Sequence, residues 1–351
     1  MVLHIFNPEH DIALAANLSN FTAPHAGRQL RHDLCCLPAV WAAPGDYVLV
    51  EDVEAARTAF SRLMHRSFDG FIDKHALARL DIVRVEPWGW DLALRSFLLR
   101  YGVKAVPSEQ EIAVIRDLSH RKTAVDLLTE LKGDGLTGAS WLADSLERVG
   151  DLLRHHQHIV VKAPWSSSGR GIRFIDGEMD DYQRRWIVNV MARQGSVVVE
   201  PYYNKVKDFG MEFESDGQGQ VRYLGLSLFH TQNGAYTGNI LAQEEEKREI
   251  ISRYLPPYLL DAIQIKICQR LGEQFKGKYR GPFGIDMMIV SNNVQWPMAN
   301  GQCLLHPCVE INLRRTMGHV ALELARHCAS DKVMRIDYFD NRYMLHISRI
   351  S

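Results

Sequence analysis

Short apolar runs separated by amphipathic stretches fill the first 115 residues of the chain. The runs that are long enough for strands are 2–6 (VLHIF), 47–51 (YVLVE), 78–87 (ARLDIVRVEP) and 103–108 (VKAVPS). Helical spacing of apolar residues connects them up to residue 17, over 53–65 and over 90–100. Strands that alternate with helices are typical of parallel sheets, so residues 1–115 are predicted to form a small doubly wound α/β domain.

The pattern changes after this domain. Ser119 is placed to cap a helix over 120–131, and residues 139–199 alternate helix and strand up to VVVEPYY (197–203). We therefore expect a second unit over 116–200 and a third over 201–351. The third unit is predicted to contain these elements: antiparallel strands at 207–215 and 220–232, a helix over 244–275, strands at 281–290 and 303–313 joined as a long hairpin by the polar segment 291–302, and a last helix from Met317. The fold class is thus α/β followed by α+β.

Composition narrows the class of protein. The 351 residues carry a formal net charge of −1, which gives no reason to expect nucleic acid or an anionic membrane as a partner. No apolar run approaches the roughly 20 residues that a membrane-spanning helix needs, and the first residues do not resemble a signal peptide. Six cysteines without a C-x-x-C pair favour reduced thiols, and His306 and Cys308 have no second pair to complete a zinc site. We expect a cytoplasmic enzyme or binding protein.

Two late strands carry acids among apolar residues. Asp286 lies within GIDMMIV, and Glu310 and Asn312 share one face of CVEINL because side chains alternate along a strand. If the strands pair as a hairpin, Asp286 lies across from Glu310, and two facing carboxylates favour a cation between them. Oxygen ligands of this kind suit Mg²⁺. The alternative is a solvated face of an edge hairpin.

A loop rich in serine and glycine separates two apolar runs in VVKAPWSSSGRGIRF (160–174). Its residues are Ser166, Ser167, Ser168, Gly169, Arg170 and Gly171. The loop matches neither the P-loop nor the dinucleotide fingerprint. It offers backbone N–H groups, hydroxyls and one arginine to an anion, and Lys162 lies on the strand that leads into it. By itself it indicates a phosphate site or a surface turn equally well.

The order of these features resembles the ATP-grasp superfamily. Lys162, the Ser/Gly-rich loop, Glu200 at a strand end, Asp286 and the Glu310-x-Asn312 pair cover residues 119–318 in that order. Residues 1–115 resemble the domain that precedes the grasp in this superfamily. More narrowly, the chain resembles bacterial ATP-grasp proteins that begin with an NPEHD-like motif, a resemblance that brings no substrate with it.

The resemblance implies a nucleotide site. Lys122 and Lys162 would contact phosphates, Ser166–Gly171 would cover the β- and γ-phosphates, and Glu200 would accept from the adenine amino group. The remaining implied contacts are the backbone of Tyr202 and Tyr203 at the hinge and Asp208 at the ribose. Simpler alternatives are an exposed helix lysine for Lys122 and core packing for the two tyrosines.

The resemblance also implies a metal and a catalytic cation. Asp286, Glu310 and Asn312 would hold one or two Mg²⁺ ions, for which Mn²⁺ would substitute. Either Arg314 or Arg315 would meet the transferring phosphate, and Arg314 is preferred because it shares the strand face of Glu310 and Asn312. Lys162 would assist it. His319 is expected on a helix surface.

The resemblance implies an ATP- and Mg²⁺-dependent ligase that joins a small carboxylate to an amine or a similar nucleophile through an acyl phosphate. A small-molecule kinase and a non-catalytic nucleotide-binding module are the alternatives, and a homo-oligomer stays open. Substrate contacts are expected past the first strand, where ligands of parallel sheets bind, and in the segment 224–239. The candidate residues are Asn7, Glu9, His10, Asp11, His230, Tyr236 and Asn239. The first four could instead lock the structure or cap a helix, and His230 could be structural.

Overall fold

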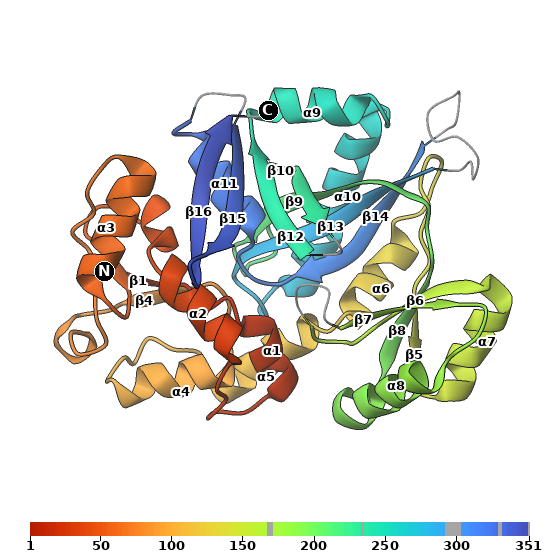
Figure 1. Ribbon diagram of the computed structural model, residues 1–351, viewed down its shortest axis with the longest axis horizontal. Helices are drawn as coiled ribbons and strands as arrows, with labels where there is room; N and C mark the ends of the chain where they lie inside the picture. Colours follow the sequence, from red (N-terminus) through yellow and green to blue (C-terminus); the bar gives the residue numbers. More distant parts are fainter. Residues whose placement is uncertain (167–170, 233–234, 292–302, 329–331, 350–351) are drawn as a thin grey trace.

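The computed structural model describes residues 1–166, 171–232, 235–291, 303–328 and 332–349, and these form four sheets of four strands each (Figure 1). The N-terminal sheet is parallel, as predicted, and has the order β3 (Phe71–Ile72), β2 (Tyr47–Leu49), β1 (Val2–Ile5), β4 (Arg84–Pro87). Its helices are α1 (His10–Ala16), α2 (His25–Leu34), α3 (Val53–Met64), α4 (Leu92–Arg100) and α5 (Glu109–Leu118), with 3-10 turns at Leu37–Val40 and Leu77–Arg79. The carboxyl ends of β1 and β2 therefore point to one edge.

The strand predicted over 103–108 is wrong. The Val103 amide donates to the Leu98 carbonyl as the chain leaves α4, and the side chain of Val103 is buried in the core of the N-terminal sheet. Pro107 has no N–H group, so the segment could not continue a strand ladder. The apolar side chains of this segment pack in one core with residues of α4, and they do not form a fifth strand.

The second sheet is antiparallel and has its own core. Its order is β5 (Trp141–Ala143), β8 (Val197–Pro201), β6 (His158–Lys162), β7 (Ile172–Asp176), and α7 (Leu146–His156) and α8 (Asp181–Gln194) pack against it. Figure 1 shows this unit, in yellow-green and green, to one side of the rest of the chain.

The third sheet carries the predicted acids. Its order is β10 (Val221–Ser227), β9 (Lys205–Ser215), β13 (Gly281–Ser291), β14 (Cys303–Asn312), with all pairs antiparallel. The helices α6 (Lys122–Glu130), α9 (Glu244–Ser252) and α10 (Pro257–Phe275) share one core with it. The other face of the sheet is left to form a site.

Two helix boundaries differ from expectation. The single helix expected over 244–275 is two helices, because Pro257 has no N–H group and takes the first position of α10. Ser119 does not cap α6. It ends α5, where its hydroxyl donates to the Ile115 carbonyl, and α6 begins at Lys122.

The fourth sheet contains the last strands of the chain and packs against helix α2 from the N-terminal domain. Its order is β11 (Phe229–Gln232), β12 (Ala235–Leu241), β15 (Lys332–Phe339), β16 (Arg342–Arg349), and α11 (Met317–Ala325) lies beside it. The strand expected over 220–232 is thus split between two sheets, and the hairpin β15–β16 was not predicted. Figure 1 shows β16 next to α2, and their apolar residues share one core. None of the helices among the described residues is long and apolar enough to cross a bilayer.

Candidate functional site

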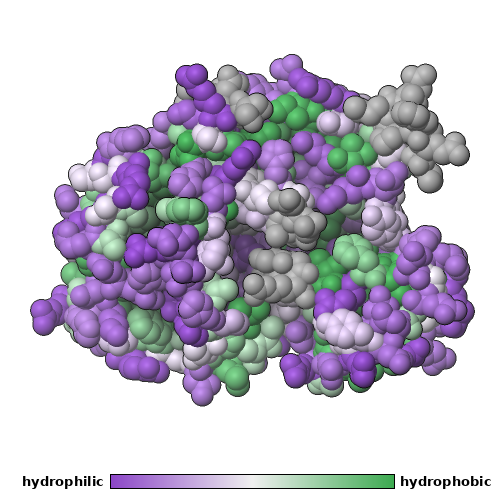
Figure 2. Space-filling model, viewed as in Figure 1, coloured by the Kyte–Doolittle hydropathy of each residue, from purple (hydrophilic) through white to green (hydrophobic). Residues whose placement is uncertain are grey.

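A cleft of about 540 Å³ lies between the segment after β1 and the open face of the third sheet. The hollow near the centre of Figure 2, beside the grey atoms, is lined by hydrophilic surface. The polar residues lining the cleft include Glu9, Asp11, Ser166, Glu212, Asp286, Glu310, Asn312, Arg314 and Thr316. Residues from five regions of the sequence therefore meet in one cavity, as an active site requires.

The predicted opposition of Asp286 and Glu310 is confirmed. They are register partners on β13 and β14, and Asn312 is opposite Gly284 two residues away. Burial, followed by the negative charges of Glu310 and Glu212, raises the pKa of Asp286 to about 8. Asn312 Nδ2 donates to Asp286 Oδ2 at 3.1 Å. Carboxylates held this close are stabilised by any cation that binds between them.

The donor chemistry of this trio fits Mg²⁺. It offers two carboxylates and one amide oxygen, and Mg²⁺ is commonly held by one or two carboxylates with water and phosphate oxygens completing the shell. No group of three or more histidine, cysteine or acidic side chains arranged for a metal exists among the described residues. Structural zinc prefers a site in which the protein supplies all four ligands, and this trio does not supply them.

Arg121 is the main residue that the sequence reasoning missed. Its guanidinium is buried, donates to Glu310 Oε1 at 2.6 Å and to Ser166 Oγ at 2.8 Å, and also bonds the Ala163 carbonyl. One cation thus joins the second sheet to the predicted metal carboxylate. The sequence shows two adjacent cations at a helix start, and their spacing does not tell which one points inward.

Lys122 points elsewhere. Its Nζ pairs with Asp117 on α5 at 2.5 Å, and the two side chains are 37% and 66% exposed. Lys122 is not among the residues that line the cleft. The arrangement is that of the exposed helix lysine considered as the alternative, and its phosphate contact stays a prediction.

Lys162 and Glu200 form a buried ion pair on neighbouring antiparallel strands. Lys162 Nζ lies 2.6 Å from Glu200 Oε2, and both side chains are 7% exposed. Close by, Tyr203 sets its ring edge-on against His306 with centroids 5.3 Å apart, and burial raises the pKa of Tyr203 to about 12. Tyr202 is 59% exposed, so core packing does not explain it.

Only the two ends of the Ser/Gly-rich loop can be placed, because Ser167, Ser168, Gly169 and Arg170 lie outside the described residues. Ser166 lines the cleft and accepts from Arg121. The backbone of Gly171 approaches it so closely that an added Cβ would lie 2.3 Å from Ser166 Cβ, so only glycine fits. The Gly171 carbonyl accepts from the Ala163 amide at 2.8 Å, which closes the hairpin.

Glu212 is a second missed residue. It lies on β9 opposite Gly284, buried on the face that carries Asp286. Its Oε2 accepts from Thr316 Oγ1 at 2.8 Å and lies 3.0 Å from His319 Nδ1. The expectation that His319 lies on a helix surface is wrong, since its ring is buried against this carboxylate. An acid inside the apolar run KDFGMEFES is the same signal that identified Asp286.

Asp208 lies on β9 of the third sheet, opposite Met288 of β13. Its Oδ2 accepts from Lys205 Nζ at 2.5 Å and from Thr231 Oγ1 at 3.2 Å. The expected ribose contact stays a prediction.

The segment Asn7–Asp11 holds the structure together, as one of the alternatives expected. Asn7 Nδ2 donates to the Gly89 carbonyl at 2.8 Å, and His10 Nε2 lies 3.0 Å from the Trp90 carbonyl. The helix-cap alternative is wrong, because Glu9 occupies the cap position of α1 and makes no side-chain cap bond. Asp11 reaches across the cleft and pairs with Arg314, 303 positions away, at 2.7 Å.

Arg314 and Arg315 point to different places. Arg314 lines the cleft and donates to Asn312 Oδ1 at 2.9 Å, which supports the preference for it over its neighbour. Arg315 places its guanidinium over the Trp41 ring, 4.4 Å from the centroid.

Of the substrate candidates in the segment 224–239, two line the cleft and one does not. Tyr236 and Asn239 line the cleft, where the Tyr236 hydroxyl bonds Asn239 Oδ1 and Asn239 Nδ2 donates to Ser227 Oγ at 2.8 Å. His230 is not among the lining residues, although Phe229 and Thr231 on either side of it are. Burial, with Lys207 and Arg335 nearby, lowers the pKa of His230. A structural role was the alternative for this histidine.

Replacing Asp11 by asparagine is expected to lower the free energy of unfolding by about 3 kcal/mol, because it leaves Arg314, whose side chain is only 16% exposed, without its carboxylate partner. Burial alone would raise the pKa of Asp11, but the charge of Arg314 and hydrogen bonds from His10 and Arg314 outweigh it and lower the pKa. A carboxylate with a lowered pKa stabilises the fold above its unfolded pKa of about 3.9, so the difference should be full at neutral pH and shrink as the pH falls below that value.

Urea unfolding at several pH values measures this effect. Asp81→Asn is the matched control, since Asp81 is an exposed acid in the same domain. Equal stabilities of the two variants at neutral pH would contradict a structural role for the pair.

No protein-family model and no curated protein sequence matches the chain. Solved structures do match it. Biotin carboxylase from Campylobacter jejuni, in a complex named as β-γ-ATP, is 13% identical, with 97% of this chain and 77% of that one covered and a TM-score of 0.55. The biotin carboxylase domain dimer of Hydrogenobacter thermophilus 2-oxoglutarate carboxylase, with MgADP, ADP and bicarbonate, is 14% identical over 97% and 75% of the two chains, with a TM-score of 0.50.

N5-carboxyaminoimidazole ribonucleotide synthetase from Thermus thermophilus is 11% identical, covers 96% and 83% of the two chains and has a TM-score of 0.50. At these identities the likeness shows the fold alone. It does so along nearly the whole length of the chain.

Proposed function

We propose that this chain, which has the ATP-grasp fold, is an ATP- and Mg²⁺-dependent ligase that joins a small carboxylate to an amine. The observation that supports it most is the composition of one cleft. Paired carboxylates and Arg314 form one wall, and the carboxyl-end segment of a parallel sheet forms the other. This arrangement would hold a triphosphate and a second substrate within reach of each other.

The named contents of the similar structures support a nucleotide and magnesium here. One contains β-γ-ATP, and another contains MgADP with bicarbonate, which is a small carboxylate-like anion. The similar proteins are named as carboxylases and a synthetase, which fits a ligase of this general kind. The second of these structures is a dimer, and a homo-oligomer stays a prediction for this chain.

The reaction proceeds in two steps. A carboxylate oxygen of the substrate attacks the γ-phosphorus, the bond to the bridging oxygen of ADP breaks, and an acyl phosphate forms. The amine then attacks the acyl carbon, loses a proton, and phosphate leaves with the C–O bonding pair. Positioning and charge neutralisation carry such a reaction, and no covalent enzyme nucleophile is needed.

The chain's residues have distinct tasks in this scheme. Bound Mg²⁺ would neutralise phosphoryl oxygens, held by Asp286, Glu310 and Asn312. Arg314, whose Nε and Nη2 are held by Asp11, would place its positive charge beside the transferring group. Lys162, buried beside Glu200, would stabilise charge on the phosphates, and burial strengthens such contacts.

Hydroxylamine tests the proposal directly. The protein is incubated with Mg·ATP, hydroxylamine and pools of amino acids and small carboxylates, and ADP and hydroxamate are both measured. A ligase should release ADP and form a hydroxamate in the pool that contains its carboxylate, because hydroxylamine intercepts the acyl phosphate. ADP with a stable phospho-product and no hydroxamate would show a kinase, and nucleotide binding without turnover would show a binding module.

A further inference from the structure

A second and larger cavity, of about 810 Å³, opens at the carboxyl edge of the N-terminal sheet. Its floor comes from the ends of β1 and β2 and from α4, and its roof comes from α2 and the segment before it. The edge beyond the carboxyl ends of parallel strands is where such sheets bind ligands. The volume is within the usual range for small-molecule sites.

The polar groups of this cavity are not fully paired with each other. Arg31 pairs with both Glu9 and Glu51, and Asp91 accepts from the Leu94 amide and from Asn7. Arg28, by contrast, donates to the Ala23 backbone, and no carboxylate partner for it occurs among the described residues. Two cations and one buried carboxylate oxygen remain without a charged partner of their own among the described residues. Asp73 and His75 also line the cavity, where Asp73 Oδ1 accepts from the His75 and Ala76 amides.

The second of these cations is Lys74, which is exposed at the rim. Its one described contact is with the Tyr101 ring, 5.9 Å from Nζ to the centroid. The oxygen is Oε2 of Glu9, which is buried and has no hydrogen-bond partner among the described residues. Burial, partly offset by Arg31, raises the pKa of Glu9, so this carboxylate would gain from a further positive donor.

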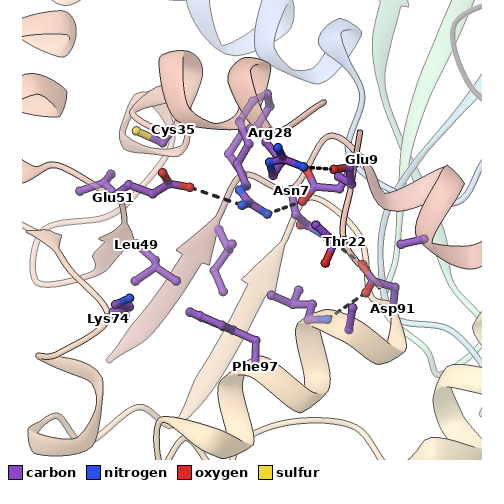
Figure 3. A pocket seen from close by; sticks show the side chains of 18 of the residues that line it. Asn7, Glu9, Thr22, Arg28, Cys35, Leu49, Glu51, Lys74, Asp91 and Phe97 are labelled. Atoms are coloured by element: carbon purple, nitrogen blue, oxygen red, sulfur yellow. Dashed lines mark hydrogen bonds and ion pairs between the residues drawn. The ribbon is translucent and has the colours of Figure 1, made fainter. Parts of the chain in front are cut away.

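Figure 3 shows how these groups are arranged. Lys74 and Leu49 lie on one side of the cavity, Glu9, Asn7 and Asp91 lie on the other, and Phe97 lies below them. A molecule that complements the cavity would have an anionic end near Lys74, an apolar middle against Leu49 and Phe97, and an ammonium at Glu9. Such a molecule is an amphoteric amine, of which amino acids are the commonest kind.

Glu9 connects this cavity to the cleft. It lines both, together with Phe6, and Asp11 two residues later pairs with Arg314 in the cleft wall. An ammonium bound at Glu9 would therefore lie beside the wall that this cavity shares with the cleft. It would be close to the place where an amine must attack.

We propose that the cavity at the N-terminal sheet binds the amine substrate, and that this substrate is an amphoteric amine anchored by its ammonium on Glu9 and by its anionic end on Lys74. That the bound molecule is a substrate rests on the proposed ligase function. The chemical class of the ligand rests on the cavity alone.

Binding without ATP tests the inference. The wild-type protein is titrated calorimetrically with the twenty common amino acids, then with the N-acetyl and the amide forms of those that bind. At least one amino acid should bind. Each modified form should bind about tenfold more weakly or worse, because each loses one charge-assisted contact. If no amino acid binds, or if N-acetylation has no effect, the inference is wrong.

Two variants locate the site. Lys74→Ala and Glu9→Gln should each weaken binding by about tenfold or more. Lys104→Ala, an exposed lysine of the same domain outside the cavity, should leave binding unchanged. Lys74 is exposed, so its variant should fold normally and decides the matter even if Glu9→Gln does not fold. Unchanged binding in Lys74→Ala would overturn the inference.

Titration with inorganic phosphate and with acetate tests whether the cavity is only an anion site. Binding of either that depends on Arg28 and Lys74 but not on Glu9 would show a plain anion site and overturn the assignment to an amine. The two proposals also fail separately. Hydroxamate formation without amino-acid binding would leave the ligase and remove this site, whereas amino-acid binding without ADP release would leave the site and remove the ligase.

Discussion

The double variant Asp286→Asn/Glu310→Gln is expected to lose at least about a thousandfold in kcat for ADP release, since several kcal/mol of metal-borne stabilisation disappear from the transition state. Both substitutions keep the shape of the side chain and remove its charge. The two register partners of the β13–β14 hairpin would then present two neutral amides to a cation that binds through carboxylates. Nucleotide affinity in the presence of Mg²⁺ should fall with the rate.

The same variant should keep the fold, with a stability change no larger than the loss of one ion pair. Asp286 is buried beside Glu310 and Glu212, and this crowding of negative charge raises its pKa to about 8. Removing two of the three negative charges relieves this repulsion, whereas the loss of the Arg121–Glu310 ion pair opposes it, so the free energy of unfolding in metal-free buffer should fall by no more than about 3 kcal/mol. A thousandfold loss of activity with so limited a loss of stability is the signature of residues kept for function.

Steady-state ADP release, Mg²⁺ titration by calorimetry and urea unfolding measure the three effects. A matched control is Asp134→Asn/Glu273→Gln, which neutralises two exposed acids outside the cleft. Wild-type turnover or unchanged Mg²⁺ affinity in the cleft variant would show that the metal assignment is wrong. A stability loss well above the roughly 3 kcal/mol of the Arg121–Glu310 pair would show that these acids are structural.

The strand pattern predicted the site better than the helix pattern did. Asp286 and Glu310 could be placed opposite each other because an acid in an apolar strand must face something polar, and alternation fixes its side. The same logic applied to Glu212 would have found it. The start of a helix sets no comparable constraint. Adjacent residues there point in different directions around one turn, so the sequence does not show which of two neighbouring cations points inward.

Long-range packing accounts for the remaining misses. The run 103–108 is apolar because it packs beneath α4, and periodicity cannot separate that from a strand. The β15–β16 hairpin is stabilised by residues from the start of the chain, including the core around α2. The role of Asn7 and Asp11 as a lock depends on Gly89 and Arg314, which no local pattern connects to them.

Arg121→Met is expected to be the most damaging single change outside the metal trio. The guanidinium neutralises Glu310 at 2.6 Å and holds Ser166 at 2.8 Å. Methionine fills similar space without donors, so Glu310 is left charged beside Asp286 and two acceptors lose their partner. Breaking a buried ion pair in this way should cost about 3 kcal/mol of unfolding free energy in metal-free buffer.

Mg²⁺ should restore part of that loss. A divalent cation at the carboxylates replaces the charge that Arg121 supplied, so Mg²⁺ should stabilise Arg121→Met more than the wild type. A cycle with Glu310→Gln tests the contact itself. If Arg121 acts through Glu310, the two substitutions together should destabilise less than the sum of each alone, because the neutral amide no longer needs the cation. Strict additivity would contradict the contact.

Lys122→Met is the decisive comparison, because the two cations are neighbours and lead in different directions. Lys122 pairs with Asp117 at the surface, so its loss should change stability by no more than about 0.5 kcal/mol. If Arg121 is the cation that serves the phosphates, Arg121→Met raises the KM for ATP and Lys122→Met does not. The opposite result would return the phosphate contact to Lys122 and leave Arg121 as a structural bridge between the second sheet and β14.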